Sequence, residues 1–206
     1  MDFIRAMVTI TGIAPLSQSH QHDEPKLEGE SHDAYDARTW RSKLNTEIVD
    51  GKPSVIIPAF GLQCAIADAA KYSKRQIPGQ GKATWTAKFK SGVAVMAPVS
   101  LGIDPADVKP IVLSVNADGI RGSGKRVTRR FPQIPPGWES TFEVIVLDPI
   151  ITEEVFTEML ELAGLFIGVG QFRPQNGGTN GRFNIKNIAW HDARQKVSSR
   201  VLAKAA

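Results

Sequence analysis

The sequence has little cysteine and no long apolar run, and both shortages limit what the protein can be. Its 206 residues include a single cysteine, Cys64, so no disulfide can form within the chain and a reducing compartment is expected. No apolar stretch approaches the roughly 18 residues that a membrane-spanning helix needs. The first residues alternate like a strand and do not form the apolar core of a secretion signal. The sequence therefore predicts a soluble, cytoplasmic protein.

Composition is ordinary for a globular domain, whereas the placement of charge is not. Apolar residues make up 42% and charged residues 22%, and the formal net charge is +4 with a pI near 9.3. This length suits a single domain over 1–206 that carries insertions. Because the net charge is modest, any electrostatic binding surface must arise from local clusters of cations.

Glycine is concentrated between Gly164 and Phe183, where the sequence reads GLFIGVGQFRPQNGGTNGRF. Such a framework lets another backbone or a ligand approach closely. Arg173 and Arg182 each lie next to a phenylalanine, and guanidinium groups beside aromatic rings suit the phosphates and bases of a nucleic acid. The alternative is a tight turn over 176–181 whose arginines only face solvent. The glycines expected to allow close approach are Gly168, Gly170, Gly177, Gly178 and Gly181.

A second unusual stretch, 116–138, predicts a long basic hairpin that resembles a thumb. Five of the ten residues from 121 to 130 are basic and none is acidic, namely Arg121, Lys125, Arg126, Arg129 and Arg130. Residues 119–125 satisfy most of a phosphate-loop pattern. However, Arg126 stands where a serine or threonine would hold magnesium, and three nearby prolines exclude the helix that the motif requires. A long basic hairpin is therefore favoured over a site for nucleotide hydrolysis.

The region 17–45 reads as a polar, mobile insertion after the first strand. His20 and His22 with Asp23 could ligate a metal, but no second half-site follows, so a solvated loop is favoured and no metal is expected. The insertion ends with cations interleaved with an aromatic residue, which predicts a further contact to nucleic acid. An equal alternative is that the tryptophan anchors the insertion to the core. These residues are Arg38, Trp40, Arg41 and Lys43.

The remaining segments alternate between strand and helix patterns. Helical spacing of apolar residues covers 61–75 and 152–163, with Thr152 as the N-cap of the second helix. Strand patterns cover 3–13, 84–101, 111–115, 141–148 and 182–190, and 191–206 reads as a basic tail. This order fits an α+β fold with a ferredoxin-like (RRM-like) βαββαβ core. Such a core leaves one sheet face open, the surface with which RNA-recognition domains bind.

The element order, the hairpin and the two stretches FIGVGQFRPQNGGTNGRF and GSGKRV resemble the RAMP superfamily, particularly the repeating backbone subunits of CRISPR effector complexes. The two stretches are also similar to proteins encoded by bacteriophages and prophages, which implies a bacterial host cell. The resemblance implies a protein that coats single-stranded RNA or DNA and assembles along it as a homo-oligomer. It also implies that the basic residues of the hairpin act as a thumb over the strand, opposite Arg173 and Arg182.

We therefore expect a binding protein without a cofactor or a catalytic residue. Some RAMP relatives cut RNA with histidine, but His20, His22, His32 and His191 have no evident partner in this sequence. Cys64 lies in an apolar helical pattern and is expected to be a small buried side chain. Two alternatives to strand coating remain, a phage structural or assembly subunit that binds protein partners and a RAMP-type endoribonuclease.

Overall fold

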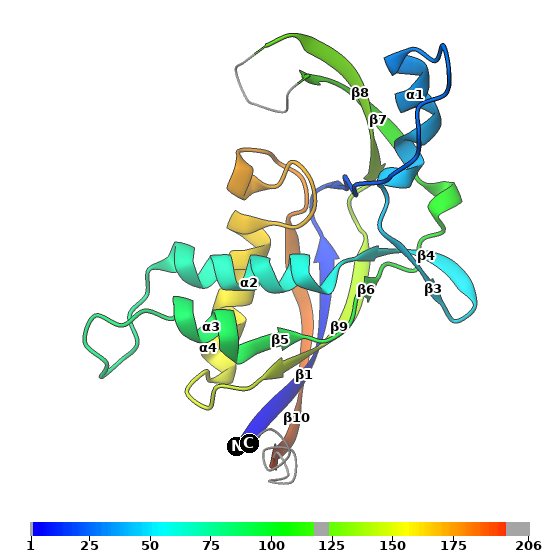
Figure 1. The fold of residues 1–206 in the computed structure, drawn as a ribbon. Helices are drawn as coiled ribbons and strands as arrows, with labels where there is room; N and C mark the ends of the chain where they lie inside the picture. The colour runs from blue at the N-terminus through cyan, green and yellow to red at the C-terminus, as the bar shows by residue number, and fades with distance from the viewer. Residues whose placement is uncertain (1, 118–123, 197–206) are drawn as a thin grey trace, which may run out of the picture.

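The fold is built on a four-stranded antiparallel sheet (Figure 1). The computed structural model describes residues 2–117 and 124–196. The sheet contains β1 (Asp2–Gly12), β5 (Val93–Val95), β9 (Glu139–Val146) and β10 (Phe183–Lys196), in the order β10-β1-β9-β5. Along the central strand β1, Ala6, Val8 and Ile10 are buried at every second position, as the alternation of side chains in a strand requires.

Two helices pack on this sheet, α2 (Ala59–Ser73) and α4 (Glu153–Leu162). Thr152 caps α4 by accepting a hydrogen bond from the Val155 N–H at 3.2 Å, and Phe156 packs edge-on against Trp190 of β10 with ring centroids 5.5 Å apart. α2 contacts both α4 and β5. Both predicted helices are therefore confirmed, and the chain order is β1, α2, β5, β9, α4, β10. No helix in the described part of the chain is long and apolar enough to cross a membrane.

The prediction of strands throughout 84–101 is wrong, because this region begins with the helix α3 (Thr86–Gly92). Trp85 and Phe89 are both buried and pack edge to face at 6.3 Å, which four-residue spacing achieves on one side of a helix. The same spacing also fits one face of a strand, so the pattern was ambiguous. Only β5 and the short β6 (Val99–Ser100) are strands in this region.

The polar insertion is largely structured and contains β2 (Leu16–Ser17), α1 (His32–Thr39) and the 3₁₀ helix η1 (Trp40–Lys43). Ser31 caps α1, since its hydroxyl accepts the Ala34 N–H at 3.1 Å. Beyond it, β3 (Thr46–Val49) and β4 (Lys52–Ile57) form a hairpin that β6 extends to a three-stranded sheet. The short 3₁₀ helix η2 (Pro105–Asp107) follows β6.

The predicted basic hairpin is present but begins earlier than 116. It consists of β7 (Lys109–Asn116) and β8 (Arg126–Ile134), paired from Lys109↔Gln133 to Asn116↔Arg126, and β2 adds a third strand at its base. The 111–115 strand is therefore one arm of this hairpin. Its far end, 118–123, lies outside the described residues.

The last strand also runs further than predicted. β10 continues through 191–196 and pairs with β1 as far as Asp2↔Lys196, so this part of the predicted tail belongs to the sheet. The rest of the tail, 197–206, lies outside the described residues. Near the other end of β1, Trp138 lies against Gly12 and its Nε1 donates to the Ala14 carbonyl at 3.0 Å.

Candidate nucleic-acid interface

The basic side chains of the β7–β8 hairpin are divided between its two faces. Because side chains alternate along a strand, Arg126 and Arg130 lie on one face, and Arg129 and Phe131 lie on the other. Figure 1 shows the hairpin projecting from the body of the molecule and arching over the side on which 163–183 lies. The two faces consequently have different surroundings, and the cations have different roles.

Three cations near the far end of the hairpin have no acidic partner in the described parts of the chain. Lys125 and Arg126 are exposed, and Arg129 is half-buried. Arg126 donates to its neighbouring strand, from Nε to Ser114 Oγ at 3.1 Å and from Nη2 to the Ser114 carbonyl at 2.6 Å. Over residues 2–117 and 124–196, none of the three forms an ion pair. Their charge is therefore available to an anion, whereas Arg121 lies outside the described residues.

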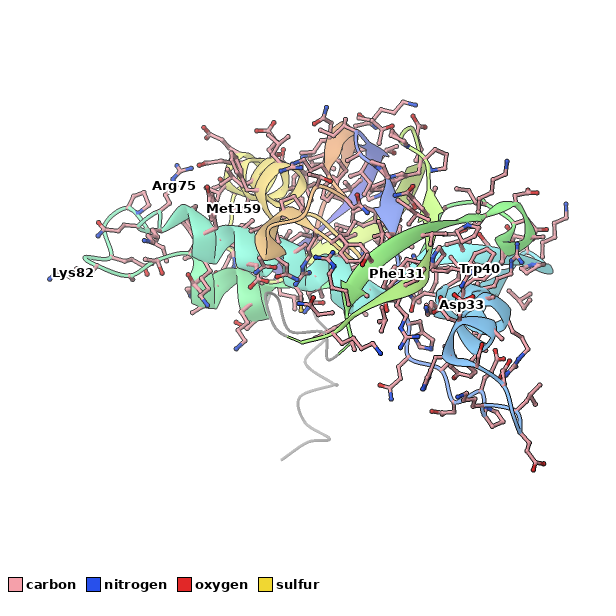
Figure 2. The ribbon with its side chains drawn as sticks, turned by 90° about the horizontal axis from the view of Figure 1, so that it is seen from above. Asp33, Trp40, Arg75, Lys82, Phe131 and Met159 are labelled. Atoms are coloured by element: carbon pink, nitrogen blue, oxygen red, sulfur yellow. The ribbon has the colours of Figure 1, made fainter. Side chains whose placement is uncertain are left out.

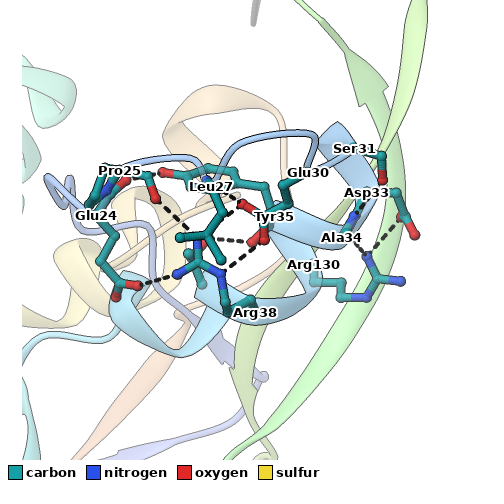
Figure 3. Close-up of polar contacts among 11 residues, drawn as sticks. Glu24, Pro25, Leu27, Glu30, Ser31, Asp33, Ala34, Tyr35, Arg38 and Arg130 are labelled. Carbon is teal, nitrogen blue, oxygen red and sulfur yellow. Dashed lines mark hydrogen bonds and ion pairs between the residues drawn. The ribbon is translucent and has the colours of Figure 1, made fainter.

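Arg130, in contrast, is neutralised by the insertion. Its Nη1 lies 2.9 Å from Asp33 Oδ1 and 3.6 Å from Asp36 Oδ2, and its backbone N–H donates to Asp36 Oδ2 at 2.6 Å. The hydrogen bond with Asp33 is the main reason that the pKa of Arg130 is raised. Figure 3 shows Arg130 pointing at Asp33 across the gap between β8 and α1. This side chain fastens α1 to the hairpin.

Lys43 also connects the insertion to the hairpin, through the other carboxylate oxygen of Asp36. Its Nζ lies 2.6 Å from Asp36 Oδ1 and 2.7 Å from the Arg130 carbonyl, and 4.9 Å from the ring centre of Phe131. Only 13% of the Lys43 side chain is exposed. Because the Lys43 ammonium group is largely buried and is bonded to both Asp36 and the Arg130 carbonyl, it links η1 to β8.

Arg38 lies within the insertion among acidic and carbonyl oxygens (Figure 3). It contacts Glu30 at 2.9 Å and Glu24 at 3.3 Å, and it donates to the Pro25 carbonyl at 3.0 Å. The hydrogen bond from Arg38 lowers the pKa of Glu30 from 4.5 to about 2, and the same bond raises the pKa of Arg38. Arg38 therefore closes the loop that precedes α1.

Arg41 and Trp40 also make contacts within the chain. The Arg41 guanidinium lies 4.4 Å from the Trp40 ring centre and donates to the carbonyls of Pro105 and Ala106, both at 3.2 Å. Trp40 is half-buried and packs on the core. Figure 2 shows Trp40, Asp33 and Phe131 together where α1 meets the hairpin. The packing favours the alternative in which Trp40 anchors the insertion.

The glycine-rich stretch forms the π-helical turn η3 (Ala163–Ile167), a loop, and the 3₁₀ turn η4 (Pro174–Asn176). Its glycines do permit close approach, but the approaching groups belong to this chain. At Gly170, with φ +76°, a Cβ would meet the Ser17 carbonyl, and at Gly181, with φ +72°, it would meet the Val169 carbonyl. Among the other predicted glycines, Gly168 and Gly177 have positive φ and Gly178 lies against the Phe172 carbonyl. The loop is a packed structural element.

Two cavities lie on either side of this loop, and each contains one of its predicted arginines. Arg173 lines a cavity of about 320 Å³ between the loop, the insertion and the start of α2, where His20 and Asn45 also lie. Arg182 lines a larger cavity of about 810 Å³ at the far end of α2. Its Nε donates to the Leu165 carbonyl and its Nη1 to the Thr179 carbonyl, both at 3.1 Å. The two arginines therefore line separate cavities.

The histidines, the cysteine and the carboxylates do not form a metal site among the residues that the structure describes. Those residues contain no group of three or more His, Cys, Asp or Glu that could hold a metal ion. His20 and His191 are exposed, while His22 lies beside Tyr35 with ring centroids 6.2 Å apart. Burial raises the pKa of the Cys64 thiol, which makes it a poorer nucleophile at neutral pH.

Sequence reasoning missed four residues that line the larger cavity. Lys71, Tyr72 and Lys74 end α2, and Phe166 belongs to η3. The cations at the end of α2 are evident in the sequence, but cations at this position also interact favourably with the helix dipole and so do not by themselves indicate a site. Tyr72 and Phe166 are far apart in the chain, so only the fold brings them together.

No protein-family model matches the sequence, and no curated protein matches it. Solved structures do match. The crystal structure of Cmr6 from Pyrococcus furiosus matches with a TM-score of 0.50 and 11% identity, over 90% of this chain and 99% of that one. A chain of a Type IV-B CRISPR complex matches with a TM-score of 0.49 and 12% identity, over 95% and 93% of the two chains.

A chain from the cryo-EM structure of the Type III-B Cmr-beta bound to cognate target RNA is also similar, with a TM-score of 0.47 and 14% identity. The match covers 92% of this chain but spans only 61% of the length of that one. At such identities the likeness concerns the fold alone. The chain is a mixed α+β protein with antiparallel sheets, and its fold is similar to that of Cmr6.

Proposed function

We propose that this protein binds single-stranded nucleic acid through the phosphate backbone and coats it without cutting it. The observation that carries the proposal is the distribution of acidic partners. Arg38, Lys43 and Arg130 are ion-paired inside the chain, whereas Lys125, Arg126 and Arg129 on the projecting hairpin are not paired within the described residues. Unpaired cations grouped on an arm attract a polyanion.

The position of the hairpin supports contact with an extended ligand. It arches over the side of the molecule that holds the glycine-rich loop, where Arg173 and Arg182 supply further cations (Figure 1). A strand lying there would meet positive charge on two sides. Cations that contact phosphates do not read base edges, so binding that tolerates many sequences is expected.

The fold is compatible with the proposal but does not carry it, because one fold serves many functions. The order β1, α2, β5, β9, α4, β10 and the sheet order β10-β1-β9-β5 support a ferredoxin-like core. We further propose that the protein acts without a cofactor, in the cytoplasm of a bacterial cell, with RNA or single-stranded DNA as its ligand. Bacteriophage or prophage origin rests on the sequence resemblance alone.

The test is a titration of labelled single-stranded RNA and DNA at two salt concentrations, with protein freed of nucleic acid. The double variant Arg126→Glu/Arg129→Glu should lose affinity by about tenfold or more at low salt, because each phosphate contact releases counterions. The slope of log affinity against log salt should also become shallower, by about 0.7 for each phosphate of a single strand that the variant no longer neutralises. Fluorescence anisotropy measures both quantities.

The matched control is Lys52→Glu/Lys90→Glu, which makes the same change in net charge at two exposed lysines away from the hairpin. Its affinity should fall much less. Equal losses in the two double variants would mean that net charge, not the hairpin, governs binding. Conversion of labelled RNA to shorter products by the unchanged protein would contradict the non-catalytic part of the proposal.

A second candidate function is a structural or assembly subunit that binds other proteins. Large apolar side chains favour it, since Ile48, Phe60 and Met96 are 72%, 78% and 63% exposed. Exposed apolar side chains of this size are available to contact another protein. Assembly in the absence of any nucleic acid would distinguish this candidate from strand coating.

A further inference from the structure

Two exposed aromatic rings are stacked on each other at the far end of α2. The rings of Tyr72 and Phe166 have centroids 5.3 Å apart and planes inclined by 19°, which is an offset stack. Tyr72 is 54% exposed and Phe166 is 47% exposed. Isolated apolar side chains on a surface are normal, but a stacked pair that remains in water presents a flat apolar platform.

Cations surround this platform. Lys71, Lys74 and Arg182 line the same cavity of about 810 Å³. The acidic side chain in its lining is Asp68, and its Oδ2 accepts a hydrogen bond from Gln175 Nε2 at 2.9 Å. The lining therefore has an excess of positive charge beside two stacked rings.

Hydrogen bonds to the backbone fix the side chain of Arg182. Two of its guanidinium nitrogens donate to the backbone carbonyls of Leu165 and Thr179, both at 3.1 Å. Leu165 precedes the platform residue Phe166, so the same backbone segment positions the cation and the ring. Preorganised donors beside an aromatic face lower the cost of ordering a ligand.

We propose that this cavity is a nucleotide subsite, in which an unstacked base of the bound strand extends the Tyr72–Phe166 stack and its phosphates contact Lys71, Lys74 and Arg182. The inference rests on the proposed function, because the base and the phosphates belong to the strand that the protein is proposed to bind. Arg182 belongs both to the glycine-rich stretch and to this cavity. Every base has a flat face, so stacking here is insensitive to sequence. An acidic protein segment would satisfy the cations but would leave the platform unused.

The test compares an ordinary single strand with an abasic strand of the same length, which keeps the phosphates and lacks the bases. Tyr72→Leu/Phe166→Leu keeps apolar bulk and removes the stacking faces. This variant should bind the ordinary strand about tenfold or more weakly than the unchanged protein does. Its affinity for the abasic strand should equal that of the unchanged protein. Tyr72→Phe should retain full affinity, and Phe60→Leu, on the other end of α2, is the matched control.

The outcomes separate this inference from the function on which it rests. Unchanged affinity of Tyr72→Leu/Phe166→Leu for the ordinary strand, with weakened binding by Arg126→Glu/Arg129→Glu, would overturn the subsite and leave strand binding standing. Equal losses on ordinary and abasic strands would also overturn it, since the rings would then act without contacting a base. Failure of the unchanged protein to bind any strand would overturn both. Thermal unfolding of each variant confirms that it is folded.

Discussion

Asp36 is the residue on which the attachment of the insertion depends. Only 3% of its surface is exposed, and its carboxylate accepts from Lys43 Nζ and from the Arg130 N–H, both at 2.6 Å. A buried carboxylate with a buried ammonium partner stabilises the fold only while both are present. A single side chain thus links α1, η1 and β8.

We predict that Asp36→Ala lowers the free energy of unfolding by about 3–5 kcal/mol, because it removes the carboxylate that pairs with the largely buried Lys43 ammonium and leaves the Arg130 N–H without that acceptor. Urea denaturation measures this change. Asp33→Ala is the matched control, since Asp33 also pairs with Arg130 but its side chain is 65% exposed, and it should cost less than about 1 kcal/mol. Similar costs for the two variants would show that Asp36 is not the centre of the attachment.

Among the elements, the glycine-rich loop is fastened to the rest of the chain through its backbone. Two of its N–H groups donate to one short segment, since the Gln171 N–H donates to the Ser17 carbonyl at 2.6 Å and the Gly181 N–H donates to the Pro15 carbonyl at 2.7 Å. The loop is therefore bound to β2 and to the residue before it. The groups that lie close to Gly170 and Gly181 are backbone carbonyls of this chain.

Gly181→Ala should destabilise the protein more than Gly102→Ala. Both glycines have positive φ, at +72° and +64°, so alanine costs about 1–2 kcal/mol of backbone strain at either site. At Gly181 the new methyl group would also overlap the Val169 carbonyl, which adds roughly 1–3 kcal/mol, whereas nothing lies within 4 Å at Gly102. Thermal or urea unfolding tests this difference. If the two variants are equally stable, the loop is able to relax around the methyl group.

At the scale of the whole molecule, most of the core could be predicted from the sequence, but little of the candidate interface could be. Thr152 and the apolar periodicity of α2 and α4 are local signals, so both helices were predicted within two residues of their bounds. The ambiguity at Trp85 and Phe89 arose because four-residue spacing fits both a helix and a strand. Local pattern cannot resolve such a case, since tertiary packing decides it.

The interface could not be predicted from charge alone, because ion pairing is a tertiary property. Arg130 and Arg129 are adjacent and look equivalent in the sequence, yet alternation along β8 turns one toward Asp33 and the other away. Arg38 and Lys43 likewise meet carboxylates that only the folded insertion presents. The prediction that these cations contact nucleic acid remains untested, and the geometry assigns them internal bonds.

Assembly is the prediction that belongs to the molecule as a whole. If the protein coats a strand as a homo-oligomer, light scattering should show particles that grow when single-stranded RNA or DNA is added and that are larger with longer strands. Arg126→Glu/Arg129→Glu should remain at its starting size. Growth without any strand would instead favour the assembly subunit, with the exposed Phe60 and Ile48 as the first surfaces to examine.

The hairpin is anchored at the middle of β8, so its outer half extends beyond the anchors like a beam fixed at one end. On one side Asp36 and Lys43 hold the backbone of Arg130, and on the other the ring of Phe131 meets Phe172, a residue at φ 58°, with centroids 5.0 Å apart. Arg126 lies four residues further out, roughly 13 Å at strand rise. A load applied there is resisted as torque at the anchors, so the stiffness of the hairpin is determined away from the exposed cations near its far end.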